Sequence, residues 1–203
     1  MSSHLRVNRY GDFVLTDAVR PAPHLPVVPR EAYRGGAYRD KASGARLAVL
    51  AASVSRERLF DVFLELLDPL GEAVDVVLET SHDGDGAAHR DLLREGIDLP
   101  VLASHLCEFE DLLLNDGCAG VAVLSTAGEM EVQFDEHKLL VVYAREVGPF
   151  EAIFRRAGVR RDDRLRLITE GEHLHSTLPR YRDEFEQLCC RVGVAPQGEV
   201  VRW

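Results

Sequence analysis

Residues 120–143 read GVAVLSTAGEMEVQFDEHKLLVVY. This stretch holds three short runs of strand-forming residues, separated by two turn sequences, Thr126–Gly128 and Asp135–Lys138. The middle run, Glu129–Phe134, alternates polar with apolar residues, so one of its faces should lie in water. Links this short join antiparallel neighbours in a sheet. The stretch therefore predicts an antiparallel meander of three strands.

A strand, a helix and a second strand are expected upstream of the meander. Residues 46–54 are mainly apolar and of strand length, which is typical of a strand covered on both faces. Ser55 is a suitable helix N-cap, and large apolar residues then recur at three- and four-residue steps as far as Leu70. The second strand is predicted over Ala73–Glu79. This order favours a right-handed βαβ crossover.

The remaining elements are expected further along the chain: a short helix through residues 92–93, a helix over 100–115, a helix over 149–158, a strand over 164–169 and a helix over 178–193. Together the elements predict an α+β protein whose mixed sheet has about six strands, one βαβ unit plus the three-strand meander, with about five helices. We expect a sandwich of two layers, or of three where helices also cover part of the second face.

Residues 1–43 are expected to form an extended arm rich in proline and arginine. Four prolines fall between residues 21 and 29, and proline fixes φ and lacks the N–H that a sheet needs. We therefore predict no regular element here beyond a short strand near Phe13–Leu15. The arm either binds a partner as a polyproline helix, or is an extended segment that wraps around its own domain or is disordered. Residues 44–203 are expected to form a single α+β domain.

Charge is distributed unevenly along the chain. Residues 57–151 carry 22 Asp and Glu against five Lys and Arg, and the whole chain has a net charge of −10. Nucleic-acid phosphates require basic side chains, so we expect no nucleic-acid partner. No apolar run reaches the roughly 20 residues that a membrane span needs, and the first ten residues lack the apolar core of a signal peptide. We therefore expect a cytoplasmic protein without a membrane partner.

The four cysteines, at positions 107, 118, 189 and 190, form no C-x-x-C pair. Adjacent positions on a helix point in different directions and rarely bridge, so the pair at 189 and 190 is not a disulfide candidate. Buried, reduced thiols are expected, with a redox or metal role as the alternative.

Two loops that combine histidines with carboxylates are the candidate metal sites. The first follows the second predicted strand and contains Glu79, His82, Asp83 and Asp85. Imidazoles and carboxylates gathered at the end of a strand suit a divalent metal. The competing interpretation is an ordinary Asp-Gly turn in which Asp85 caps the next helix and the histidine is solvated.

The second candidate loop follows the last predicted strand and contains His173 and His175. These two side chains share a face if the segment is extended, which is one way to hold a metal from two imidazoles. If the preceding strand lies near the second strand and parallel to it, both loops would open at the same edge and share one site. An exposed acidic loop leading to a helix cap at Ser176 or Thr177 is the competing interpretation. The remaining histidine-bearing turn, Asp135–Lys138, is interpreted as solvated.

Sequence signatures of common enzymes are absent. The chain has neither the G-x-G-x-x-G nor the P-loop fingerprint of nucleotide-binding proteins, and no serine stands in a G-x-S-x-G setting. The sequence thus favours a non-enzymatic interaction or regulatory module that binds a protein partner or a second copy of itself. The alternative is a metal-dependent hydrolase that uses the two loops, and a divalent metal is expected as cofactor only in that case. A small-molecule pocket between sheet and helix is a third hypothesis.

Overall fold

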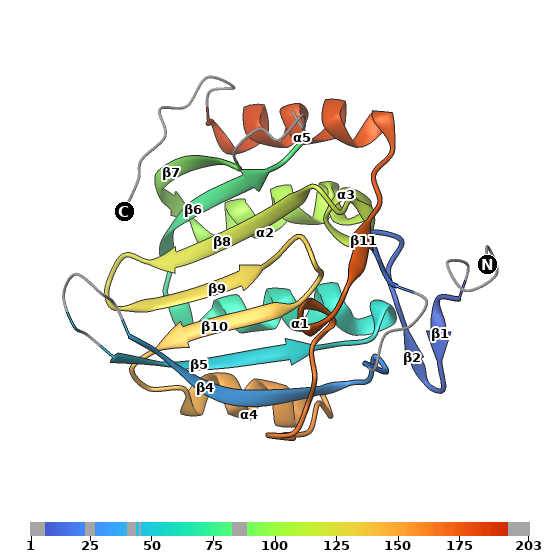
Figure 1. The fold of residues 1–203 in the computed structure, drawn as a ribbon. Helices are drawn as coiled ribbons and strands as arrows, with labels where there is room; N and C mark the ends of the chain where they lie inside the picture. Colours follow the sequence, from blue (N-terminus) through green and yellow to red (C-terminus); the bar gives the residue numbers. More distant parts are fainter. Residues whose placement is uncertain (1–6, 23–26, 40–43, 45, 83–88, 195–203) are drawn as a thin grey trace.

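A seven-stranded antiparallel sheet organises the computed structural model, which describes residues 7–22, 27–39, 44, 46–82 and 89–194 (Figure 1). The strands lie in the order β4-β5-β10-β9-β8-β6-β7, and every neighbouring pair is antiparallel. Their bounds are β4 (Ala32–Arg39), β5 (Arg46–Ser53), β6 (Ala73–Thr80), β7 (Arg90–Asp98), β8 (Ala119–Ser125), β9 (Met130–Phe134) and β10 (Leu140–Ala144).

The predicted meander forms the centre of this sheet as β8, β9 and β10. Val132 of β9 lies directly between Val123 of β8 and Val142 of β10. All three valines are fully buried, because opposed residues of neighbouring strands place their side chains on the same face. The α+β class and the three-strand meander are therefore confirmed.

The connection between β5 and β6 differs from the predicted βαβ unit. These strands run parallel to each other, but the whole meander lies between them, so they do not pair. The sheet is consequently antiparallel throughout and has seven strands, where a mixed sheet of about six was expected. The order of strands depends on contacts between segments distant in sequence, which hydrophobic periodicity does not encode.

β7 occupies the place where a short helix was predicted. Its buried residues Leu92 and Ile97 are five positions apart and would face opposite sides of a regular strand. The pairing of β7 with β6 shifts register between Val74 and Val76, and Gly96 has a φ of +63°. Such a bulge inserts one residue and brings both side chains to the core face, which conceals the alternation in the sequence.

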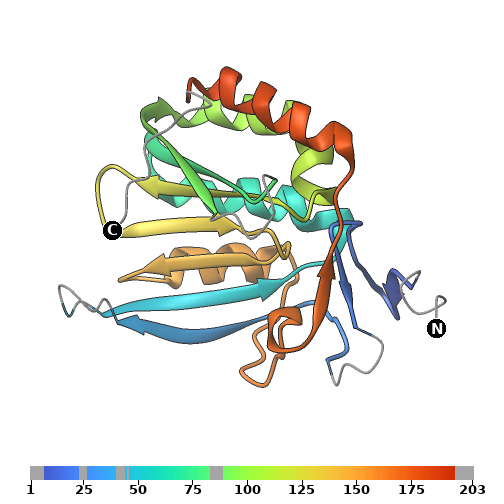
Figure 2. The same ribbon diagram turned by 45° about the horizontal axis from the view of Figure 1, so that its top comes forward.

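The described chain contains five α-helices: α1 (Arg56–Leu67), α2 (Leu99–Glu108), α3 (Glu110–Asn115), α4 (Gly148–Arg156) and α5 (Pro179–Val192). In both views α1, α2 and α4 lie behind the sheet, and α5 packs against α2 and α3 (Figure 1, Figure 2). The main core lies between these layers. Phe63 of α1 contacts Phe134 of β9 with 5.2 Å between ring centroids, and Phe154 of α4 stacks on Tyr33 of β4 at 4.9 Å.

The chain after α4 crosses the other side of the sheet without forming the strand predicted over residues 164–169. Leu165 and Leu167 instead pack against Ala32 and Leu139 in a small cluster, and a short 3-10 helix, η3 (Ile168–Glu170), follows. These leucines are buried by side-chain packing, without the hydrogen-bonded pairing of a strand. Alternate buried residues also occur in strands, so the apolar pattern of this segment resembles that of a strand. The next segment, β11 (His173–His175), pairs antiparallel with β3 (Val19–Pro21).

The N-terminal region contains more regular secondary structure than the extended arm that was predicted for it. β1 (Arg9–Tyr10) and β2 (Phe13–Val14) form a small hairpin, and β2 lies where a short strand was expected. β4 pairs along its whole length with β5, so residues 32–39 belong to the main sheet. Among the described helices, none combines the length and the apolar character that crossing a membrane requires. All four cysteines are free thiols, but only Cys189 is fully buried.

Candidate metal centre

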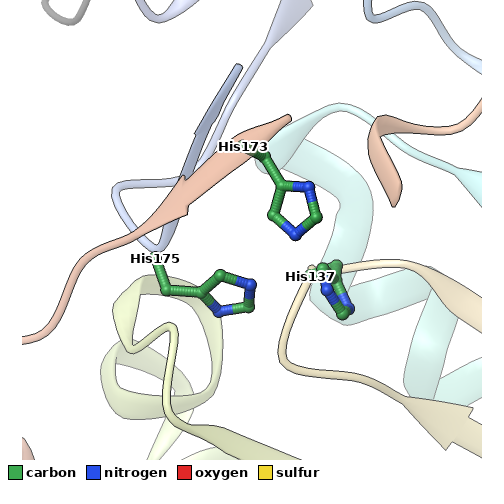
Figure 3. Close-up of side chains that lie close together, drawn as sticks. All are labelled: His137, His173 and His175. Atoms are coloured by element: carbon green, nitrogen blue, oxygen red, sulfur yellow. The ribbon is translucent and has the colours of Figure 1, made fainter. Parts of the chain in front are cut away.

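His137, His173 and His175 converge at one end of the sheet (Figure 3). His137 lies in the turn between β9 and β10, and the other two histidines project from β11. One nitrogen of each ring lies within 4.8 Å of the others, and the ring centroids are 4.7 to 5.1 Å apart. Nitrogen ligands of one zinc ion are roughly 3 Å apart, so a small closure of the three rings would complete a metal site.

The hydrogen bonds of the three imidazoles fix their tautomers. Nδ1 of His173 lies 2.8 Å from the Gly171 carbonyl oxygen, and Nδ1 of His175 lies 2.6 Å from that of Gly117. Nδ1 of His137 is 3.1 Å from the Asp135 carboxylate. Because carbonyl and carboxylate oxygens only accept, each Nδ1 must carry the proton and donate it. In its neutral form each ring therefore keeps a lone pair on Nε2, which is the usual arrangement of metal-binding histidines.

The pairing of β11 with β3 positions His173 and His175. Their partners in the register are Pro21 and Val19, so both histidines lie on the same face of the two-stranded ribbon. The pairing continues past the strand ends, since Ser176 N donates to the Ala18 carbonyl at 2.7 Å. Sequence reasoning predicted the shared face correctly in the extended segment 173–175, although it placed that segment in a loop.

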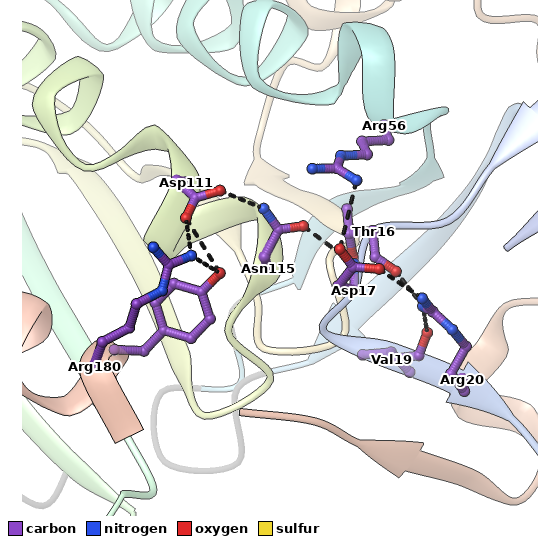
Figure 4. Close-up of polar contacts among 9 residues, drawn as sticks. Thr16, Asp17, Val19, Arg20, Arg56, Asp111, Asn115 and Arg180 are labelled. Atoms are coloured by element: carbon purple, nitrogen blue, oxygen red, sulfur yellow. Dashed lines mark hydrogen bonds and ion pairs between the residues drawn. The ribbon is translucent and has the colours of Figure 1, made fainter. Parts of the chain in front are cut away.

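A polar network holds the chain that leads into β3 against the helices (Figure 4). The backbone N–H of Asp17 donates to Asn115 Oδ1 at 3.2 Å, and Asn115 Nδ2 donates to Asp111 Oδ1 at 2.8 Å. The other oxygen of Asp111 accepts from Arg180 at 2.7 Å and from the hydroxyl of Tyr181 at 3.2 Å. β3, and through it β11, is thereby tied to α3 and α5.

Gly117 permits the close approach between the loop before β8 and the end of β11. A Cβ at this position would lie 2.5 Å from the Ala18 carbonyl oxygen and 3.0 Å from Ser176 N. Gly117 N donates to the Ser176 carbonyl at 2.8 Å, while its own carbonyl accepts the Nδ1–H of His175. Only glycine can therefore hold this loop where it orients His175.

We expect the Gly117→Ala variant to bind zinc about 10- to 100-fold more weakly than the wild type, because loss of an orienting partner typically has that effect. The added methyl group would push the loop away from β11 and remove the hydrogen bond to His175. The measurement is competition for zinc with a chromophoric chelator. Gly128→Ala is the matched control, since a Cβ there meets no atom within 4 Å. Equal affinities of the two variants would contradict the positioning role.

A strained turn places His137. Lys138 has a φ of +62°, which is unusual for a residue with a side chain. Its side chain is buried, and Nζ donates to the Ala119 carbonyl at 2.8 Å. Asp135 closes the turn, because its carboxylate also accepts the N–H of Leu139 at 2.8 Å. The turn that sequence analysis interpreted as solvated is thus anchored inside the protein.

The electrostatics of the turn combine burial with nearby charge. Burial lowers the pKa of Lys138 to about 8, although Asp135 and Asp116 act in the opposite direction. At His137, burial tends to lower the pKa, but the hydrogen bond and charge of Asp135 outweigh it, so the pKa is raised. The same carboxylate would favour a bound cation at His137.

The other predicted metal ligands lie elsewhere. His82 belongs to a neighbouring cluster with Asp116 and Cys118, and residues 116–118 join it to the centre through the Gly117 carbonyl. Asp83 and Asp85 lie outside the described residues. Glu79 lies in β6 on the sheet face opposite the main core, since the burial of that strand alternates. His137 was missed because its partners are distant in sequence, and a histidine between acidic residues in a turn gives only a weak signal.

Glu79 belongs to an acidic groove of about 300 Å³ on this opposite face. Five carboxylates from three strands line the groove together with four apolar side chains: Asp75, Glu79, Asp91, Glu95 and Glu131, with Val77, Leu93, Ala122 and Leu124. No Lys or Arg of the described chain is among the lining residues. Burial, followed by the charges of Asp91 and Asp135, raises the pKa of Glu79 to about 7.

We expect Glu79→Gln to raise the free energy of unfolding at pH 8 and to change it little below pH 4.5. The unfolded carboxyl titrates near 4.5 and the folded one near 7, so the wild type loses stability as the pH rises through this window. Partial exposure of Glu79 reduces the expected gain to about 1–2 kcal/mol. Urea unfolding at both pH values measures it, with Glu95→Gln, at an exposed position of the groove, as control. A gain that is equal at both pH values would contradict the assignment.

Comparisons with protein-family models, curated proteins and solved structures find no match for this chain.

Proposed function

We propose that the chain is a metal-dependent hydrolase that holds a divalent transition metal ion through His137, His173 and His175. The observation that carries the proposal is the shared arrangement of the three rings, each of which donates Nδ1–H to an oxygen and leaves Nε2 free. Imidazole nitrogens favour zinc, copper, iron or nickel over magnesium or calcium. Among these ions zinc is the simplest occupant, because three histidines are a known catalytic zinc set.

The number and exposure of the ligands favour a catalytic over a structural site. Structural zinc sites are closed by four protein ligands, whereas catalytic sites have three and keep one position open. Here His175 is exposed and the other two histidines are half-buried, so solvent and substrate can reach the open position. A metal ion in such a site lowers the pKa of bound water to about 7, which supplies a nucleophile for hydrolysis.

The test is hydrolysis of activated phosphoesters, carboxylic esters and amides by the zinc-loaded wild type and by His137→Ala. We expect zinc-dependent turnover of at least one substrate class, and loss of that turnover in the variant. His89→Ala is the matched control, because the His89 side chain is 57% exposed and lies outside the three-histidine centre. Turnover that survives in His137→Ala, or that is absent from the zinc-loaded wild type with all three classes, would contradict the proposal.

The acidic groove favours a second candidate function, the binding of a protein partner through a basic, partly apolar segment. Burial raises the pKa values of both Glu79 and Glu131, so removing these carboxylates from water without a counter-charge is unfavourable. A cationic partner is favoured over a second copy, which would bring a further net charge of −10. A labelled Lys/Leu peptide should bind the wild type, and its affinity should fall as the salt concentration rises. The affinity should also fall in a variant in which Glu79, Asp91 and Glu131 are replaced by the corresponding amides. Unchanged binding to that variant would contradict this function.

A further inference from the structure

We infer that His82, Asp116 and Cys118 form a second, partly buried metal site that lies beside the three-histidine centre and is suited to zinc. His82 follows β6, and the other two residues directly precede β8, so all three lie at the same end of the sheet. One ligand atom of each residue lies within 4.8 Å of the others. The inference does not depend on the proposed hydrolase, since the two sites share no ligand.

Two buried atoms of this cluster lack hydrogen-bond partners. His82 Nε2 and Asp116 Oδ2 are 2.8 Å apart, and the side chains are 7% and 0% exposed. They form an ion pair when the ring is protonated, but neither atom has a hydrogen-bond partner among the described residues. Leaving such polar atoms buried without a hydrogen-bond partner is unfavourable. A buried pair of this kind requires an explanation, and a cation bound by both atoms provides one.

The other ring nitrogen of His82 is already engaged. Nδ1 lies 2.7 Å from Thr80 Oγ1, and the same hydroxyl accepts the backbone N–H of His82 at 3.2 Å. Thr80 thereby fixes the ring and directs Nε2 toward Asp116. When Nδ1 carries the proton, a lone pair on Nε2 faces a carboxylate lone pair, and a cation must sit at Nε2 to make the arrangement favourable. A proton would serve and would give an imidazole–carboxylate ion pair; a metal ion bound by both atoms would serve equally.

The distances and donor types suit zinc. Nitrogen and oxygen ligands at about 2.0–2.2 Å from one zinc ion lie roughly 3 Å apart, close to the separation of His82 Nε2 and Asp116 Oδ2. Cys118 would supply the third donor, and the side chains of Ser81 and Thr177 hydrogen-bond its sulfur. Imidazole, carboxylate and thiolate are all common zinc ligands, and a thiolate discriminates against magnesium and calcium.

The loop that bears two of these ligands also connects the two sites. Gly117, between Asp116 and Cys118, accepts the Nδ1–H of His175 through its carbonyl oxygen. A metal ion at the second site would hold this loop in place and so keep His175 correctly oriented.

Cobalt(II) substitution of the reduced, metal-free chain tests the inference, because a cobalt–thiolate bond gives a charge-transfer band in the near ultraviolet. We expect the wild type to show this band, and Cys118→Ser to lack it and to bind one cobalt ion fewer per chain. Asp116→Asn should weaken the band at limiting cobalt. Cys107→Ser and Cys190→Ser, at exposed thiols, are matched controls that should retain it. Circular dichroism confirms that each variant is folded.

The outcomes separate this inference from the proposed hydrolase. A band that persists in His175→Ala, while that variant loses one cobalt ion, supports two independent sites. A wild-type chain without the band, or a band that persists in Cys118→Ser, overturns the second site and leaves the three-histidine centre unaffected.

Discussion

The His175→Ala variant should bind zinc at least about 100-fold more weakly than the wild type, because it loses one of three nitrogen ligands. Removing only the orienting partner of a ligand typically weakens binding 10- to 100-fold, and loss of the ligand itself should have a larger effect. The remaining pair, His137 and His173, would hold the ion with two bonds only. The alanine removes an exposed side chain and leaves the pairing of β11 with β3 intact, so the fold should be retained.

Competition with a chromophoric zinc chelator measures this affinity at neutral pH. The matched control is His89→Ala, which removes an imidazole that is 57% exposed and paired only loosely with Glu136 at 3.6 Å. That variant should bind zinc like the wild type. If His175→Ala keeps the wild-type affinity, the ion is not held by β11 and the centre is wrong.

Zinc should also stabilise the folded chain against heat. An ion that binds only the native state adds about 2.7 kcal/mol when its free concentration is 100 times the Kd. For a chain of this size that corresponds to a rise in Tm of about 5–10 °C. The structural reason is that the ion would join the β9–β10 turn to β11, which pairs with β3 and not with the seven-stranded sheet.

Thermal unfolding followed by circular dichroism, with zinc and then with excess chelator, measures the shift. Magnesium provides a second comparison, because it prefers oxygen ligands and should leave the Tm unchanged. In the variant in which His137, His173 and His175 are all alanine, zinc should raise the Tm clearly less than in the wild type. A shift of equal size in that variant would assign the stabilisation to another site.

Local patterns in the sequence predicted the parts of the fold that local interactions determine. The meander was predicted because alternation and short turns act between adjacent residues, as in Glu129–Phe134. The separation of β5 from β6 could not be predicted, because it depends on where the meander inserts. β7 was hidden for a different reason: a bulge places Leu92 and Ile97 on one face at a spacing that no regular strand has.

In the candidate centre, too, only the residues related by a local pattern could be predicted from the sequence. His173 and His175 were identified because alternate residues of an extended segment share a face, which is a local property. His137 was not, because its approach to them depends on the pairing of β11 with β3 and on the buried anchor of Lys138. Asp116 likewise gave no signal in the sequence, and its full burial beside His82 follows only from the packing of the loop before β8.

Metal content is the most direct measurement of the central claim, the three-histidine centre. Tag-free wild type and the variant in which His137, His173 and His175 are all alanine would be saturated with zinc, freed of excess ion and compared by elemental analysis. The structure predicts one zinc ion fewer per chain in the variant, whatever the occupancy of the second site. Equal zinc content in the two proteins would contradict the centre and the hydrolase proposed on it.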